Sequence, residues 1–256
     1  MPSHGRLAIV GIGPGSPAQL TGRAREVLEQ AAYVIGNDTY LAQLGPLLEG
    51  KKVITSSMGK EVERARRSIE LAREAPVVMV SGGDAGIYGM AGIVLEILER
   101  DGVDLPWEVV PGITASQAAA SILGSPLSGD FATLSLSDLL TPLEVIERRL
   151  HAAFSMGVPV VLYNPRSRGR PHNFALAMEI AGEYRSPATP VGIVRNAYRD
   201  GEEAVITTLG EISGVEGKVD MHTTVIVGGE ETRIWRNGED VRGIITPRGY
   251  HRKYLY

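Results

Sequence analysis

Residues 7–15 read LAIVGIGPG, a short apolar run that passes directly into three alternating glycines. The run has the length and the β-branched composition of a buried strand. Glycines at positions 11, 13 and 15 allow the chain to turn sharply and allow a ligand to approach the backbone closely. A strand followed by such a turn and then by a helix is typical of an α/β fold.

The same succession of strand, glycine turn and helix occurs twice more. Residues 77–81 form a second β-branched run, which is followed by the turn Gly82-Gly83-Asp84-Ala85-Gly86. Residues 108–110 form a third, which is followed by Pro111-Gly112-Ile113-Thr114. In a parallel sheet, the loops after the carboxyl ends of the strands lie at one edge, where α/β proteins bind ligands. We therefore expect the three turns to line one edge of the same sheet.

Strand-like runs alternate with helical patterns along the chain, which predicts an α/β fold of two domains. The break GSPLSG at residues 124–129 predicts the boundary, giving an N-terminal domain of residues 1–124 and a C-terminal domain of residues 125–256. We expect a largely parallel sheet in the first domain and a mixed sheet in the second, where strands follow one another more densely. The predicted strands cover residues 7–10, 33–35, 53–54, 77–81, 108–110, 133–135, 158–163, 190–195, 204–208 and 223–227.

A charged helix is predicted over residues 60–75. Its apolar positions recur at helical spacing, and we expect Val62, Ala65, Ile69 and Ala72 to face inward. We expect Arg64 at the surface, because glutamates neighbour it in the sequence.

The composition excludes several classes of site and partner. The 256 residues contain no cysteine, which rules out disulfides, thiolate zinc sites, iron–sulfur clusters and cysteine nucleophiles and fits a cytoplasmic protein. A formal net charge of −4 argues against nucleic-acid binding, and no apolar run approaches the roughly 18 residues that a membrane helix needs. The five histidines have no metal-ligand spacing, so we expect no metal site.

The first glycine turn is also compatible with a dinucleotide site, which leaves an NAD-dependent oxidoreductase as an alternative. The Rossmann fingerprint requires glycine at position 16, where this chain has Ser16. Pro14 removes a backbone N–H where a pyrophosphate needs a donor. Asp38, after the second predicted strand, nevertheless suits the acid that binds a ribose.

Two residues of the later turns have both a binding and a structural interpretation. Asp84 suits a ribose hydroxyl or an ammonium group, or it caps the helix that follows. Thr114 is a favourable helix N-cap, which by itself explains its presence.

The three turns resemble those of the tetrapyrrole methylase superfamily, which uses S-adenosylmethionine (SAM). Further segments resemble the branch that methylates carbon 17 of a precorrin or cobalt-precorrin in cobalamin biosynthesis. The resemblance covers residues 7–250, with one departure at Ala85, where the superfamily usually has proline. The segments that carry it are residues 86–91 (GIYGMA), 130–142 (DFATLSLSDLLTP), 162–167 (LYNPRS) and 246–250 (TPRGY).

This resemblance implies a two-domain α/β fold, usually as a homodimer, with the active site and SAM in the cleft between the domains. It implies transfer of a methyl group from SAM to carbon 17 of precorrin-3B or cobalt-factor III, with contraction of the macrocycle. The residues that it implies as SAM contacts are Pro14, Gly82, Gly83, Asp84, Ile87, Thr114, Ala115, Asn164, Ala197 and Thr223.

Ring contraction needs acid–base help, and our hypothesis is that Asp38 or Asp138, with Tyr40 or Tyr88, supplies it. These residues lie at predicted strand ends or in loops. A structural interpretation explains each aspartate equally well: Asp38 as a turn residue, and Asp138 as part of the approach to the helix cap at Thr141. Tyr40 is in addition a candidate for contact with the substrate.

The substrate of this branch carries several carboxylates, so the acidic chain must present local positive charge. Residues 164–172 contain three arginines and no acid, and a guanidinium matches the geometry of a carboxylate. Arg166 and Arg168 are therefore the candidate substrate ligands, although a solvated loop explains them equally well.

Two alternatives remain within tetrapyrrole chemistry. One is a different methylase of the superfamily, such as a uroporphyrinogen-III methyltransferase, against which residues 130–142 and 164–167 argue. The other is a module that binds a tetrapyrrole without catalysis.

Overall fold

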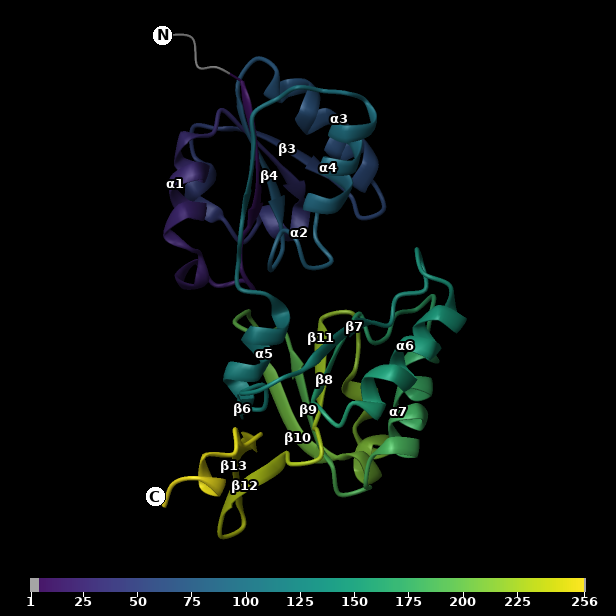
Figure 1. Cartoon of the computed structure of the whole chain (residues 1–256). Helices are drawn as coiled ribbons and strands as arrows, with labels where there is room; N and C mark the ends of the chain where they lie inside the picture. The colour runs from purple at the N-terminus through teal and green to yellow at the C-terminus, as the bar shows by residue number, and fades with distance from the viewer. Residues whose placement is uncertain (1–4, 256) are drawn as a thin grey trace. The chain divides into compact units, whose positions relative to one another are not determined.

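The computed structural model describes residues 5–255, and the chain divides into two compact units, the first ending at Ala115 and the second beginning at Ser116 (Figure 1). The predicted boundary at residues 124–129 falls one helix after this division. Helix α5 (Ala115–Leu123) packs on the second unit: the hydroxyl of Tyr163 accepts a 2.8 Å hydrogen bond from the N–H of Ser116. No helix among residues 5–255 has the length and apolar character needed to cross a bilayer.

The first unit is built on a five-stranded sheet in which all neighbouring strands are parallel, as predicted. The carboxyl ends of the five strands therefore lie at one edge, which we call the first rim. The strands lie in the order β3 (Lys52–Ser56), β2 (Tyr33–Asn37), β4 (Pro76–Ser81), β1 (Arg6–Gly11) and β5 (Trp107–Val110).

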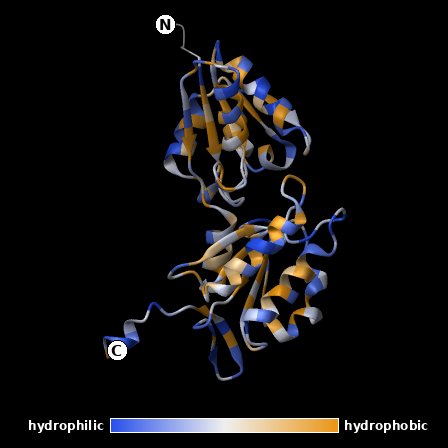
Figure 2. Cartoon of the chain, turned by 45° about the vertical axis from the view of Figure 1, so that its right-hand side comes forward, coloured by the Kyte–Doolittle hydropathy of each residue, from blue (hydrophilic) through white to orange (hydrophobic). Residues whose placement is uncertain are grey.

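Helices cover both faces of this sheet because successive strand residues point to opposite sides. Leu7 and Ile9 of β1 pack with α3 and α4 on one face, whereas Ala8 and Val10 pack with α1 and α2 on the other. Figure 2 shows the resulting pattern, in which the strands are mostly apolar and the helices carry polar residues outward. The helices are α1 (Gly22–Gln30), α2 (Asp38–Leu41), α3 (Glu61–Ala72) and α4 (Ala91–Arg100), with short 3-10 turns at Pro17–Gln19 and Gly45–Leu48.

Helix α3 differs from its prediction at two positions. Ala65, Ile69 and Ala72 are buried as expected, but Val62 is 53% exposed and Arg64 is only 4% exposed. The buried face of α3 extends on the side that includes Arg64, which leaves Val62 at its margin. The expectations that Val62 faces inward and that Arg64 lies at the surface were therefore wrong.

The second unit contains the mixed sheet that the sequence predicted. Strands β7 and β8 are parallel, and the other three neighbouring pairs are antiparallel. The strands lie in the order β10 (Glu203–Thr208), β9 (Pro190–Arg195), β11 (Thr223–Val227), β8 (Val160–Tyr163) and β7 (Ala132–Ser135).

Helices α6 (Leu143–Ser155) and α7 (Asn173–Tyr184) pack on one face of this sheet (Figure 1). A small third sheet was not predicted. It consists of β12 (Arg233–Asn237), β13 (Asp240–Ile245) and the two-residue strand β6 (Gly124–Ser125). Three short 3-10 segments complete the unit, at Leu209–Gly214, Glu216–Lys218 and Tyr250–Arg252.

Arg185 is a buried cation that ties together the ends of several elements. Its guanidinium donates hydrogen bonds to the carbonyl oxygens of Phe154, Val158 and Gly228 at 2.6, 3.1 and 3.3 Å. Burial lowers the pKa of Arg185, but a guanidinium stays charged at neutral pH. The three carbonyl dipoles therefore stabilise a charge that has left water, and they fix the turn after α6 against β11.

Replacing Arg185 with Met should lower the free energy of unfolding by about 3 kcal/mol, because it leaves buried carbonyl oxygens without donors. Urea denaturation measures this difference. Arg149→Met is the matched control: Arg149 is exposed on α6, so the same substitution there should change stability by about 0.5 kcal/mol or less. Equal effects at both positions would contradict this account of Arg185.

Candidate functional site

The three glycine turns meet at the first rim, which confirms the sequence expectation. Gly13 and Gly83 exchange backbone hydrogen bonds of 2.9 and 3.0 Å, which join the turn after β1 to the turn after β4. The N–H of Gly112, in the turn after β5, donates to the carboxylate of Asp84 at 3.0 Å. The turns after three adjacent strands thus form one connected structure.

Two of the glycines are required because backbone packs directly on backbone. A Cβ on Gly112 would lie 2.2 Å from the carbonyl oxygen of Gly83 and 2.7 Å from the carbonyl carbon of Gly11. A Cβ on Gly11 would lie 2.7 Å from the backbone nitrogen of Gly112. Any side chain at these positions would push the three turns apart.

Gly83 serves a different purpose. It has a φ of +66°, which disfavours any residue with a side chain, and a Cβ there would meet no atom nearer than 3.8 Å. The positive φ, and not a clash at Cβ, is therefore what requires glycine here. Gly83 is partly exposed, and without a side chain its backbone can be approached closely by a ligand.

Asp84 organises the turn after β4 with both of its carboxylate oxygens. Oδ1 accepts hydrogen bonds from the N–H groups of Gly86 at 2.7 Å and Ile87 at 3.1 Å, and Oδ2 accepts the one from Gly112. The expected alternative, that Asp84 caps the following helix, was wrong in detail, because α4 begins only at Ala91. A carboxylate accepts about four hydrogen bonds, so these three leave capacity for a ligand.

Aromatic residues flank this turn. The ring of Tyr40 packs against Gly82, where a Cβ would lie 2.5 Å from a ring carbon. Tyr88 is 56% exposed and has a φ of +51°, which is uncommon for a bulky residue. Ile87 beside it is 42% exposed. The turn therefore presents apolar side chains next to open backbone.

The remaining predicted residues of the first unit also belong to the rim. Pro14 lies in the turn after β1, and Thr114 and Ala115 follow β5; Thr114 is buried. Asp38 begins α2 directly after β2 and is exposed. Since β2 is next to β4 in the sheet, Asp38 lies on the same rim as Asp84.

Sequence reasoning missed the part that Arg64 has in this rim. Its Nη1 donates to Ser56 Oγ at 2.7 Å and to the carbonyl oxygen of Ser57 at 3.3 Å, and its Nη2 lies 3.5 Å from Met90 Sδ. Arg64 thereby links the end of β3 to the end of the turn that contains Asp84. A signal was present: Arg64 occupies the same i, i+4, i+8 row as the small residues Ser68 and Ala72.

In the second unit, the predicted residues lie at the edge where β7, β8 and β9 end and β11 begins. We call this edge the second rim. Asn164 follows β8 with a φ of +51°, and its Nδ2 donates to Ser135 Oγ, at the end of β7, at 3.0 Å. Thr223 at the start of β11 pairs with Arg195 at the end of β9. Ala197 follows two residues after Arg195.

Thr223 belongs to a network centred on Asp220. Asp220 Oδ1 accepts hydrogen bonds from the Thr223 hydroxyl at 3.0 Å and the His222 N–H at 2.8 Å, and Oδ2 accepts from Arg195 Nε at 2.8 Å. Burial raises the pKa of Asp220, but these donors together outweigh it, so the pKa lies below the ordinary value. The hydroxyl of Thr223 is therefore held in place by the carboxylate.

The two arginines that are candidate substrate ligands differ in the interactions that they make within the protein. Arg166 donates to the carbonyl oxygen of Glu216 at 3.3 Å and pairs with its carboxylate at 3.6 Å. Arg168 is exposed. Asp138 is also exposed and belongs to the second unit, whereas Asp38, Tyr40 and Tyr88 belong to the first.

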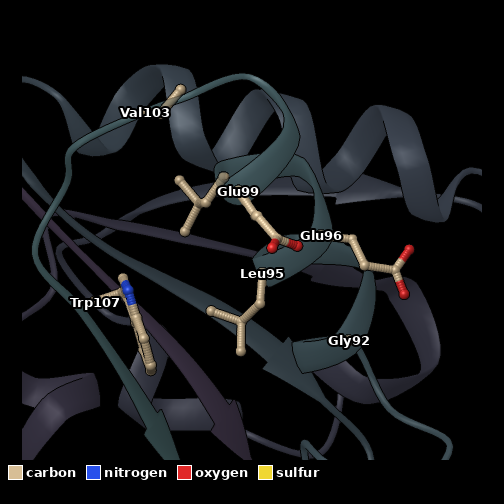
Figure 3. A pocket seen from close by; sticks show the side chains of 7 residues that line it. Gly92, Leu95, Glu96, Glu99, Val103 and Trp107 are labelled. Carbon is tan, nitrogen blue, oxygen red and sulfur yellow. The ribbon is translucent and has the colours of Figure 1, made fainter.

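A surface hollow between α4 and β5 lies outside both rims (Figure 3). Trp107, Leu95 and Val103 border it together with the carboxylates of Glu96 and Glu99. None of its lining residues belongs to the glycine turns, so the hollow is separate from the candidate site.

Gly112→Ala should lower the free energy of unfolding by about 2 kcal/mol, because the new methyl group meets two backbones that cannot both move away. Gly92→Ala is the control. A Cβ on Gly92 meets nothing within 4 Å, so alanine in this exposed helical position should be neutral or stabilising by up to about 1 kcal/mol. Urea denaturation distinguishes the two, and a neutral Gly112→Ala would show that the turns are not held together as described.

The Asp220 network predicts a pH-dependent contribution to stability. The lowered pKa means that the ionised carboxylate stabilises the fold above the model-compound pKa of 3.8 and that this contribution is lost as the pH falls through the folded-state value. Asp220→Asn should therefore cost about 1 kcal/mol at neutral pH, a modest value because the pair is partly exposed. The difference between the two proteins in urea denaturation should shrink as the pH falls below 3.8. A cost that is independent of pH would contradict the assignment.

Comparison with known proteins places these features in a family. Residues 6–213 match the family model described as Tetrapyrrole (Corrin/Porphyrin) Methylases. A protein from Salmonella typhimurium named "Probable cobalt-factor III C(17)-methyltransferase" is 46% identical over 95% of this chain and 99% of its own. "Cobalamin biosynthesis protein CbiHC" from Archaeoglobus fulgidus is 46% identical over 99% of this chain, which spans only 55% of that relative's length.

Solved structures agree with the sequence matches. The structure described as "Crystal structure of the methyltransferase CobJ" superposes with a TM-score of 0.87 at 33% identity, covering 95% of this chain and 100% of that chain. A uroporphyrin-III C-methyl transferase from Thermus thermophilus, complexed with S-adenyl homocysteine, superposes with a TM-score of 0.66 at 29% identity, covering 88% and 97% of the two chains. The family model and the relatives together show that this chain belongs to the tetrapyrrole (corrin/porphyrin) methylase family.

Proposed function

We propose that the protein is a SAM-dependent C-methyltransferase of cobalamin biosynthesis. In this proposal it methylates carbon 17 of precorrin-3B or cobalt-factor III, and contraction of the macrocycle accompanies the transfer. The observation that carries the proposal is the first rim: three glycine turns held together by backbone contacts, with the partly exposed Gly83 beside Asp84. Family membership and the name of the relative from Salmonella typhimurium support the reaction.

The residues of the first rim fit the nucleoside of SAM better than a dinucleotide. The carboxylate of Asp84 suits ribose hydroxyls and repels a phosphate, and Pro14 offers no N–H to a pyrophosphate. Gly83 supplies backbone with no side chain on it, and Ile87 supplies an exposed apolar side chain beside it. Gly82 packs against Tyr40 and is a proposed contact on the basis of the family resemblance. The Thermus thermophilus relative complexed with S-adenyl homocysteine supports this assignment. The family resemblance supports five further proposed contacts with SAM. Two are in the first rim or directly after it, Thr114 and Ala115, and three are in the second unit, Asn164, Ala197 and Thr223.

SAM supplies an electrophilic methyl group, so the chain has to bind and orient the two reactants rather than activate a weak nucleophile. Correct orientation alone supplies about 7–11 kcal/mol of barrier lowering in favourable cases. The rigid backbone of the first rim suits this task, because its geometry does not depend on mobile side chains.

Ring contraction requires proton transfer, and we propose Asp38 or Asp138, with Tyr88 or Tyr40, for this step. Asp38 and Tyr40 lie in α2 after β2, and Tyr88 lies in the turn after the neighbouring strand β4. Arg166 and Arg168 are proposed to bind carboxylates of the substrate, Arg168 with the greater freedom because it is exposed. The homodimer and the cytoplasmic location stay predictions.

The proposal is tested by incubating the purified protein with SAM and, separately, with cobalt-factor III, precorrin-3B or uroporphyrinogen III. We expect cobalt-factor III or precorrin-3B to gain the mass of one methyl group. Neither substrate should gain mass in a control reaction without SAM. Transfer to uroporphyrinogen III alone would assign another methylase activity. Macrocycle binding without transfer would indicate a binding module, and tight binding of NAD instead of SAM an oxidoreductase.

The acid–base assignment is tested in the same assay. Asp38→Asn or Asp138→Asn should reduce ring contraction at least about tenfold while SAM affinity stays unchanged. If both variants contract the ring normally, neither aspartate is the proton donor or acceptor.

A further inference from the structure

Two adjacent leucines project into solvent from the second unit. Leu139 and Leu140 are 79% and 93% exposed, in the loop that joins β7 to α6. Figure 1 shows this loop extending away from the sheet before the chain enters α6. Leucine is among the residues most often buried, and two neighbours at this exposure form a small apolar surface that no residue of the second unit covers.

The loop is anchored next to the leucines, so their exposure does not come from a frayed segment. Leu136 is fully buried, its N–H donates to the carbonyl oxygen of Tyr163 at 2.9 Å, and its own carbonyl accepts from Asn173 Nδ2 at 2.8 Å. On the other side, the carbonyl oxygen of Pro142 accepts from the N–H groups of the first turn of α6. The fold thus holds both ends of the loop and presents its tip.

Positive charge lies beside this apolar tip. Strands β7 and β8 are parallel neighbours, with Ser135 opposite Tyr163 at their ends, so the loops that follow them leave the sheet side by side. The loop after β8 contains Arg166, Arg168 and Arg170 and no acid. The hydrogen bond between Asn164 and Ser135 joins the bases of the two loops.

We infer that Leu139 and Leu140 bind the apolar face of the tetrapyrrole macrocycle while Arg168 binds one of its peripheral carboxylates. This inference rests on the proposed function. A tetrapyrrole precursor is a broad, largely apolar ring with anionic side chains at its edge, and a pair of aliphatic side chains next to an exposed guanidinium matches both parts. A neutral partner, such as a second copy of the apolar surface, would offer no anion to Arg168, the exposed arginine of the adjoining loop.

The test is the double substitution Leu139→Ser with Leu140→Ser in the full chain. With cobalt-factor III as substrate, or precorrin-3B if the wild type prefers it, we expect the tetrapyrrole KM to rise about tenfold, equivalent to about 1.4 kcal/mol. The dissociation constant of SAM and kcat at saturating substrate should stay within about twofold. Leu139→Met with Leu140→Met should restore the low KM, because the apolar surface is kept.

Two further variants complete the experiment. Met156→Ser is the matched control: Met156 is 63% exposed at the end of α6, so it removes an apolar side chain of similar exposure elsewhere in the same unit and should leave KM unchanged. Arg168→Gln should raise the tetrapyrrole KM and spare SAM binding. Urea denaturation of every variant identifies any that fail to fold.

The outcomes separate this inference from the proposed function. If the wild type methylates a tetrapyrrole and the serine double variant has the same KM, the inference is overturned and the proposed function stands. Two results with an unchanged KM would assign the leucines to another partner. Loss of self-association in light scattering would indicate a second copy of the chain, and loss of binding to phosphatidylglycerol vesicles would indicate a lipid surface. If the wild type neither binds nor methylates any tetrapyrrole, both proposals fail.

Discussion

The close approach of three backbone segments at the first rim is the constraint on which the candidate site depends. The carbonyl oxygen of Gly83 occupies the space that side chains on Gly11 and Gly112 would need. This packing sets the spacing of the turns after β4, β1 and β5. Asp84 binds two N–H groups of its own turn and the N–H of Gly112 after β5, and the Gly13–Gly83 backbone pair joins the turn after β1.

The fold was predictable from the sequence wherever a strand is buried. Strands such as β1 and β4 have continuous apolar runs because both of their faces are covered by helices, and this signal is local. Strands β12 and β13 were missed because they are mostly exposed and read as charged segments. Their partner β6 has only two residues, and its pairing with Ile244 and Ile245 joins segments about 120 positions apart, which no local pattern reveals.

The candidate site was predictable in its backbone and less so in its side chains. A glycine-rich segment after a strand directly predicts a tight turn whose backbone a ligand can approach, so this part of the site was predictable. Arg64 was misjudged because neighbouring glutamates predict a solvated face. It does pair with Glu61 at 3.5 Å, but its other partners, Ser56, Ser57 and Met90, come from other segments. Helical rhythm identifies residues that share a face, but it does not identify the distant groups that satisfy a buried guanidinium.

The two rims solve different binding problems with different means. The first rim presents mainly backbone, whose geometry depends on the glycines and on Asp84, and in the proposed function this suits a ligand that is the same across a family. The second rim presents exposed side chains such as Arg168 and Leu140, whose replacement would leave the buried sheet unchanged. Relatives named for uroporphyrin-III and cobalt-factor III methylation have different named substrates. With the proposed function, we therefore expect differences in substrate among such proteins to arise in the loops of the second rim, since a change in the packed glycine turns would affect the fold of the first unit before it affected specificity.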